Sequence, residues 1–192
     1  LLTDAKCTES DLYLNANIQL NKLEPDPDIA HHISELFYKR ENFDKTIEYY
    51  KNAIELEEDD KKKADYSTEL AILTFEERED KVTAREYARQ AIEFNPDNGR
   101  PFLLIGRLYA ESTEECGEEE FEQKAVLWAA VDKFQKAKQV DSDIADEAQG
   151  YIDSYRPRFP DKKDIFFQNY EIGDTYQIGC WINETTTVRT SE

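Results

Sequence analysis

The side chains best suited to chemistry in this chain are two adjacent histidines, His31 and His32, followed closely by Glu35. Imidazole nitrogens and a carboxylate are ligands that zinc accepts. On a helix, His31 and Glu35 share a face because they lie four residues apart. Adjacent residues, however, point about 100° apart, so the two histidines are poorly placed to bind one metal ion. We therefore expect a solvated helix face here and no metal site.

The acidic stretch Glu111–Glu122 contains seven glutamates and is the second concentration of ligand-type side chains. A calcium-binding EF-hand loop needs glycine at its sixth position and glutamate at its twelfth. With Gly117 at the sixth position, Gln123 falls at the twelfth, so the pattern fails. We expect the glutamates from Glu118 onward to begin a helix that runs to about Val140, because helix N-termini favour anions. Weak, unspecific calcium binding stays an open alternative.

Motifs that mark common catalytic sites are absent from the sequence. It contains no phosphate loop, dinucleotide fingerprint, G-x-S-x-G elbow or H-E-x-x-H motif. Carboxylates are so numerous that a close pair would say nothing about glycosidase chemistry. Asn183–Thr185 fits the N-glycosylation acceptor pattern, but such triplets arise by chance in any chain. We predict a protein that is not an enzyme and that uses neither a cofactor nor a metal.

The composition describes a folded, acidic and mainly helical chain. Its 192 residues include 43 Asp and Glu but only 24 Lys and Arg, which gives a formal charge of −19. A field of that sign repels phosphates and disfavours binding to nucleic acid or anionic membranes. The 11 Tyr, 10 Phe and 2 Trp argue against disorder, because acidic disordered chains contain few aromatic residues. Only 6 Gly and 6 Pro are present, which favours helix over sheet.

Neither a membrane-spanning segment nor a targeting segment is recognisable. No stretch approaches the roughly 20 apolar residues of a transmembrane helix, and the first residues lack the basic and apolar regions of a signal peptide. The chain contains no Met, so we interpret it as a fragment or a processed form. Its three cysteines, Cys7, Cys116 and Cys180, are far apart and odd in number. We expect free thiols, and the cellular compartment stays open.

Three segments share one ending, in which an alanine is followed by a large apolar residue and then by an acidic or proline turn. These segments are Ala53–Glu58, Ala91–Pro96 and Ala137–Ser142. Their first alanines are separated by 38 and then 46 residues, and both spacings become 34 if insertions of 4 and 12 residues are allowed. We place the first insertion near Lys61–Ala64 and the second at about 111–124.

The region before each ending also repeats. Its clearest copy carries Phe102, Ile105, Gly106, Tyr109, Ala130, Phe134 and Ala137. This copy resembles the tetratricopeptide repeat, a 34-residue helical hairpin with the signature W-x₂-L-G-x₂-Y…A-x₃-F…P. Ala30–Ala53 and Thr68–Pro96 match more loosely, and Leu20–Pro25 resembles the end of an earlier repeat. The resemblance covers roughly residues 10 to 142.

Hydrophobic periodicity indicates the same fold independently. Ile33 and Phe37 lie at helical spacing, as do Ile47 and Tyr50 after the short polar turn Glu41–Asp44. Two amphipathic helices joined by so short a turn must lie antiparallel, and a lone hairpin cannot bury its apolar face. We therefore predict an all-α fold, an α-α superhelix of tandem helical hairpins with a short β-like tail.

The predicted organisation follows from this frame. Residues 1–26 end a truncated repeat, 27–60, 65–98 and 99–142 are three repeats, 143–155 form a capping helix, and 156–192 form an extended or hairpin tail. The tail is rich in β-formers between Thr175 and Val188. We expect it to fold back onto the helices, because Trp181 and Ile182 need cover. It resembles the ends of some bacterial repeat proteins of unassigned function, which implies no activity.

First helices of tetratricopeptide-like repeats line a concave groove that takes peptides or protein surfaces. The resemblance implies a groove formed by His31, Glu35, Tyr38, Lys39, Tyr66, Glu69, Leu73, Glu76, Arg100, Leu103 and Arg107. The family's best-known pocket clamps a C-terminal carboxylate with Lys, Asn and Arg. The corresponding faces here hold His31, Glu35, Glu69 and Leu103, so that clamp is absent. Tyr and Glu at one end and arginines at the other favour a mixed-charge or basic partner.

We predict a non-catalytic scaffold that binds a protein or peptide in this groove, without nucleic acid and without insertion into a membrane. Two alternatives stay open. One is a divalent-metal or carbohydrate-binding module that uses the acidic stretch with Trp128 or Trp181. The other is a purely structural segment of a longer solenoid.

Overall fold

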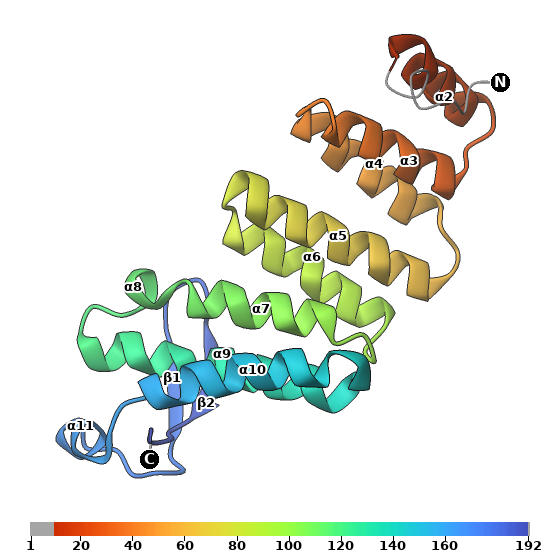
Figure 1. Cartoon of the computed structure of the whole chain (residues 1–192). Coiled ribbons are helices and arrows are strands. Elements are labelled where there is room, and N and C mark those ends of the chain that lie inside the picture. The colour runs from red at the N-terminus through yellow and green to blue at the C-terminus, as the bar shows by residue number, and fades with distance from the viewer. Residues whose placement is uncertain (1–9, 192) are drawn as a thin grey trace.

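A computed structural model of the chain describes residues 10–191, which are mostly helical with one small two-stranded antiparallel sheet near the end of the chain (Figure 1). The helical class expected from composition and periodicity is confirmed at this level. Cys7 and the first nine residues of the predicted 1–26 segment lie outside the described residues. Within the described range, no helix combines the length and the apolar character needed to cross a membrane.

Short polar side chains start many of the helices. In chain order the helices are α2 (Asp11–Leu23), α3 (Pro27–Tyr38), α4 (Phe43–Leu56), α5 (Asp60–Arg78), α6 (Lys81–Phe94), α7 (Arg100–Ala110), α8 (Thr113–Cys116), α9 (Glu120–Val140), α10 (Ala145–Tyr155) and α11 (Lys162–Phe167), with 3-10 turns at Ser142–Ile144 and Arg156–Arg158. Ser10, Asp26, Asn42, Asp59 and Asp80 each accept a hydrogen bond from an N–H group of the first turn, which satisfies donors that the helix leaves free.

The helices pack mainly in consecutive pairs, α3 with α4, α5 with α6 and α7 with α9, and the pairs follow one another along the molecule (Figure 1). Small residues let the partners approach closely. Ala53, Ala84 and Ala91 have no exposed surface. A Cβ atom on Gly106 would lie 2.5 Å from the ring of Phe134, so the crossing of α7 and α9 requires glycine at this position.

The largest part of the hydrophobic core lies at the α7–α9 end of the molecule. Trp128, Tyr109 and Phe134 are fully buried there. Helix α10 adds Tyr151 and Tyr155, whose rings stack on Phe134 with centroid separations of 4.8 and 5.8 Å. This stacking covers the outer side of α9, so α9 is packed between α7 and α10.

The tail after α11 folds back and joins this core. Its strands β1 (Thr175–Ile178) and β2 (Glu184–Thr187) pair antiparallel, with Ile178 opposite Glu184. Ile178, Ile182 and Val188 are buried among residues of α7, α9 and α10. The first strand ends earlier than the run of β-formers in the sequence, because the chain turns between residues 179 and 183 through a left-handed residue at Cys180.

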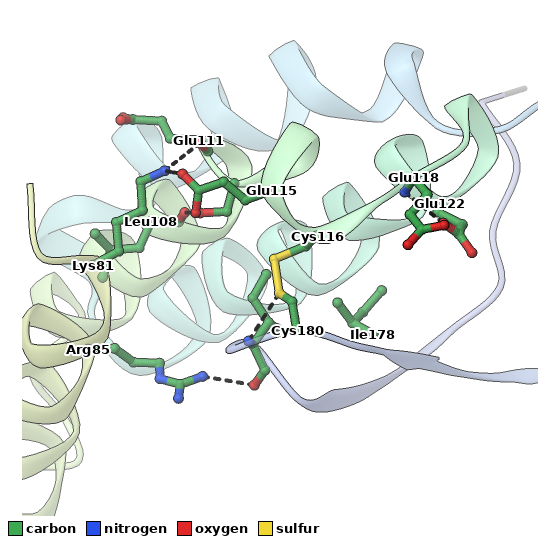
Figure 2. Close-up of a disulfide and its surroundings, with 12 residues drawn as sticks. Lys81, Arg85, Leu108, Glu111, Glu115, Cys116, Glu118, Glu122, Ile178 and Cys180 are labelled. Atoms are coloured by element: carbon green, nitrogen blue, oxygen red, sulfur yellow. Dashed lines mark hydrogen bonds and ion pairs between the residues drawn. A yellow bond between two sulfur atoms is a disulfide. The ribbon is translucent and has the colours of Figure 1, made fainter.

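The expectation of free thiols is wrong for two of the three cysteines. Cys116, at the end of α8, forms a disulfide with Cys180 in the tail, and the two Cα atoms are 5.3 Å apart. The partners are separated by 64 residues. Spacing along the chain did not reveal this pair, because only the folding of the tail brings its turn beside α8. The bond attaches the acidic stretch Glu111–Glu122 to the tail (Figure 2).

Candidate functional site

Helices α3, α5 and α7 carry the residues that the sequence placed in a binding groove, and we call the surface they form the first-helix face. On this face, His31 contacts side chains of both α4 and α5. The ring of His31 stacks on that of Tyr66 with centroids 4.5 Å apart and meets the edge of the Tyr50 ring at 5.3 Å. Its Nε2 atom lies 2.7 Å from Oε2 of Glu69. The hydroxyl of Tyr50 donates to the same carboxylate oxygen at 3.1 Å. Glu69 thereby connects α3, α4 and α5.

This arrangement shifts the protonation of both members of the pair. Burial alone would lower the pKa of His31, but the hydrogen bond and the charge of Glu69 outweigh it, so the pKa of His31 is raised. Burial would raise the pKa of Glu69, yet bonds from His31 and Tyr50 outweigh this effect, so the pKa of Glu69 is lowered. The pair therefore favours a positive imidazolium beside a negative carboxylate.

A second polar connection lies one turn closer to the start of α3. Lys62 donates to Oδ1 of Asp28 at 3.0 Å, and the hydroxyl of Tyr66 donates to the same oxygen at 2.9 Å. The hydrogen bond from Lys62 is the main reason why the pKa of Asp28 is lowered. Tyr66 thus stacks on His31 with its ring and holds Asp28 with its hydroxyl, so two neighbouring side chains of α3 are fixed by one side chain of α5.

Other predicted groove residues are exposed but do not join this cluster. Glu35 lies 3.3 Å from Nδ1 of His32, and the hydroxyl of Tyr38 donates to Glu77 at 2.8 Å. The remaining exposed members are Lys39, Glu76 and Arg100. The charges of Glu35, Lys39, Glu76 and Arg100 are therefore accessible to solvent.

Three predicted groove residues belong to the core, namely Tyr66, whose ring and hydroxyl contacts are given above, and two leucines. Leu73 and Leu103 are buried, so a partner on the first-helix face would not reach them without rearrangement. Arg107 is half-buried, with its guanidinium 5.6 Å above the ring of Phe75. The apolar side chains of these helices lie toward the neighbouring helices, whereas helical spacing alone assigns apolar and polar residues to one face.

The two histidines have separate partners. While His31 bonds to Glu69, Nε2 of His32 lies 3.0 Å from the hydroxyl of Tyr13 on α2. Among residues 10–191, no group of three or more His, Cys, Asp or Glu side chains is arranged to hold a metal ion. The acidic stretch has a structural use, because the Glu122 carboxylate accepts a hydrogen bond from the N–H of Glu118 at 2.8 Å and caps α9.

A carbohydrate site would need an aromatic ring whose face is open to solvent. Trp128 has no exposed surface. Trp181 is half-buried between two neighbours, with the guanidinium of Arg85 4.8 Å above its ring and Tyr109 at its edge. Both tryptophans therefore serve to pack the tail.

Sequence reasoning missed a polar hub that attaches the tail to three helices. The carboxylate of Glu184 accepts hydrogen bonds from Arg89 of α6 at 2.8 Å, Tyr109 of α7 at 2.6 Å and Lys133 of α9 at 2.6 Å. Burial would raise the pKa of Glu184, but these donors outweigh it and lower the pKa. No local signal could reveal this hub, since Arg89 is 95 residues away in sequence.

The disulfide extends the attachment of the tail to α8. Figure 2 shows Cys116 and Cys180 between α8 and the tail, with Arg85 of α6 donating to the carbonyl oxygen of Ile182. Lys81 of α6 donates to the carbonyl oxygen of Glu111 at 2.8 Å and pairs with the carboxylate of Glu115. These contacts join helix α6 to both the acidic stretch and the tail, and the disulfide joins the acidic stretch to the tail.

Compared with known proteins, the chain matches no family model and has no significant match among curated proteins.

Proposed function

We propose that this protein is a non-catalytic scaffold of tetratricopeptide-like repeats that binds a protein or peptide segment on its first-helix face. One observation carries the proposal most strongly. The His31–Tyr66–Glu69 cluster holds polar and aromatic side chains from successive hairpins in fixed positions on a partly exposed surface. Preorganised groups of this kind lower the entropic cost of binding.

The charges on the first-helix face favour a segment that is basic or of mixed charge. Glu35 and Glu76 are exposed on α3 and α5, whereas Arg100 is exposed at the start of α7. A segment that lies across the three helices would meet carboxylates first and a guanidinium last. Complementary charges of this kind direct the orientation of a partner and increase the rate of association.

A displayed random peptide library is a suitable probe because the partner is unknown. We expect the wild-type protein to enrich a mixed-charge or basic consensus. The double variant Glu35→Lys/Arg100→Glu should lose at least about tenfold in affinity for these peptides, which corresponds to one lost charge-assisted contact. The matched control Glu93→Lys/Lys136→Glu changes exposed residues of α6 and α9 by the same charges and should bind like the wild type.

Two results would contradict the proposal. One is the absence of any enriched consensus, which would favour a purely structural segment. The other is equal loss of binding in both double variants, because that result would reflect the overall field of the protein and no particular face. Circular dichroism would verify that both variants keep the helical content of the wild type.

A further inference from the structure

A cavity of about 260 Å³ lies where the tail meets α9 and the turn after α10. We call it the tail pocket, and none of its residues belongs to the first-helix face. Its lining consists of Val131, Gln135, Arg156, Phe159, Ile172, Arg189 and Thr190. It lies below the usual range of roughly 300–1,000 Å³ for pockets that hold drug-sized ligands, so it suits a group about as large as one amino-acid residue.

The lining is positive although the chain is strongly acidic. The residues that form the tail pocket include two arginines and no Asp or Glu, in a protein with a formal charge of −19. Arg189 is held in place by Asp132 at 2.8 Å and by the carbonyl oxygen of Trp128 at 2.6 Å. Arg156 is exposed and forms no ion pair within residues 10–191. Its charge is therefore available to an anion.

Two polar atoms of the lining are buried and have no hydrogen-bond partner. They are Nε of Arg189 and the hydroxyl oxygen of Thr190. Buried polar groups are usually hydrogen-bonded, because their desolvation is otherwise not repaid. An N–H and an O–H group from adjacent residues can donate to the two oxygens of one carboxylate, and bonds to an ionised acceptor are the stronger kind.

The rest of the lining is apolar. Val131 and Phe159 are buried, whereas Ile172 is 56% exposed and lies at the edge of the cavity. A ligand that placed a carboxylate against Arg189 and Thr190 could cover part of Ile172 with an apolar group. Burial of that exposed surface would favour binding in addition to the charge.

From these observations we infer that the tail pocket binds a carboxylate carried by a small apolar group. Arg156 supplies the unpaired positive charge, Arg189 and Thr190 supply donors, and Val131, Phe159 and Ile172 contact the apolar part. A free organic acid and the last residue of a peptide chain share this chemistry. The experiment below separates these two sources.

The two tryptophans provide a direct readout by NMR. The indole N–H of Trp128 donates to the carbonyl oxygen of Arg189 at 2.8 Å, whereas Trp181 packs on Arg85 and Tyr109. Titration with N-acetyl-leucine should shift the indole signal of Trp128 and leave that of Trp181 in place. N-acetyl-leucinamide, which has no carboxylate, should shift neither signal.

Variants identify the residues responsible. Arg156→Gln should weaken binding of N-acetyl-leucine by about tenfold or more, as expected for loss of a charge-assisted contact. Thr190→Val should also weaken it. The matched control Arg158→Gln removes an exposed arginine two residues away that lines a different cavity, and it should bind within about twofold of the wild type.

The source of the carboxylate follows from a third titration with the peptide Gly-Ser-Gly-Leu, bearing a free or an amidated C-terminus. Tighter binding of the free peptide than of N-acetyl-leucine indicates a peptide end, and equal binding indicates a free acid; either result supports the inferred chemistry. The inference would be overturned by equal binding of acid and amide, by equal loss in Arg156→Gln and Arg158→Gln, or by no shift at about 10 mM acid, a concentration well above a millimolar Kd.

Discussion

Removal of the Cys116–Cys180 disulfide should lower the stability of the protein by an amount that the length of the closed loop sets. The partners are separated by 64 residues. In the chain-entropy description, opening a loop of that length restores unfolded-state entropy worth about 4 kcal/mol at 25 °C. The double variant Cys116→Ser/Cys180→Ser isolates this effect, because serine keeps the size of the side chain close to that of cysteine.

Urea unfolding monitored by circular dichroism measures the loss. For an m-value of about 3 kcal/mol/M, a change of 4 kcal/mol lowers the midpoint by about 1.3 M. The m-value should not fall, because Ile178, Ile182 and Val188 remain buried and keep the tail attached without the bond, while opening the loop can only expand the unfolded chain. Thiol titration of the unfolded, oxidised wild type should detect one of its three cysteines.

Two results would refute this reasoning. A midpoint shift below about 0.3 M with a constant m-value would mean that the bond constrains the unfolded chain far less than its loop length implies. Three reactive thiols in protein that was never reduced would mean that the pair does not form. A lower m-value in the variant would instead show that the tail detaches and exposes part of the core.

Three further predictions concern single side chains. Glu184→Gln leaves three donors with a neutral acceptor and should lower the free energy of unfolding, measured in urea, by about 1–3 kcal/mol. An unchanged urea midpoint would show that the hub contributes nothing to stability. The pKa of His31 is raised in the folded state, so its contribution to folding stability is complete below the unfolded pKa of about 6.5 and is lost as pH rises through the folded pKa. The urea midpoints measured at pH 5.5 and at pH 8 should therefore differ less in His31→Gln than in the wild type. An equal difference in both proteins would show that His31 does not contribute to the pH dependence of stability. Gly106→Ala places a methyl carbon 2.5 Å from a phenylalanine ring and should destabilise by about 1–3 kcal/mol. Gly150→Ala, with no atom within 4 Å of the new Cβ, should stabilise by about 0.5–1 kcal/mol, and thermal unfolding of both variants tests the contrast.

The helices were predictable because their signals are local. Asp59 and Asp80 each precede a helix and cap it, and alternation of apolar and polar residues at helical spacing marks the buried faces. The expected helix from Glu118 begins two residues later at Glu120, since the Glu119 and Glu122 side chains cap its first turn. Such small shifts arise because several glutamates in a row could each serve as the cap.

The site was less predictable because its contacts cross large distances in sequence. His31 and Glu69 are 38 residues apart, and only the packing of α3 against α5 selects Glu69 among many carboxylates. Leu73 lies on the same helix as Glu69 but is buried, which a one-dimensional pattern does not separate from a contact residue. The pairing of Cys116 with Cys180 depends on where the tail docks, and no residue near either cysteine encodes it.

The attachment of the tail to α6 affects the order of events during synthesis. Arg85 and Ile182 are hydrogen-bonded although 97 residues separate them. At a translation rate of about 5–20 residues per second, α6 is made roughly 5–20 s before the segment that covers it. The first two hairpins can fold in the order in which they are made, whereas the apolar surface around Tyr109 must wait for Trp181 and Ile182. This half of the molecule is therefore the part whose nascent form most needs protection from aggregation.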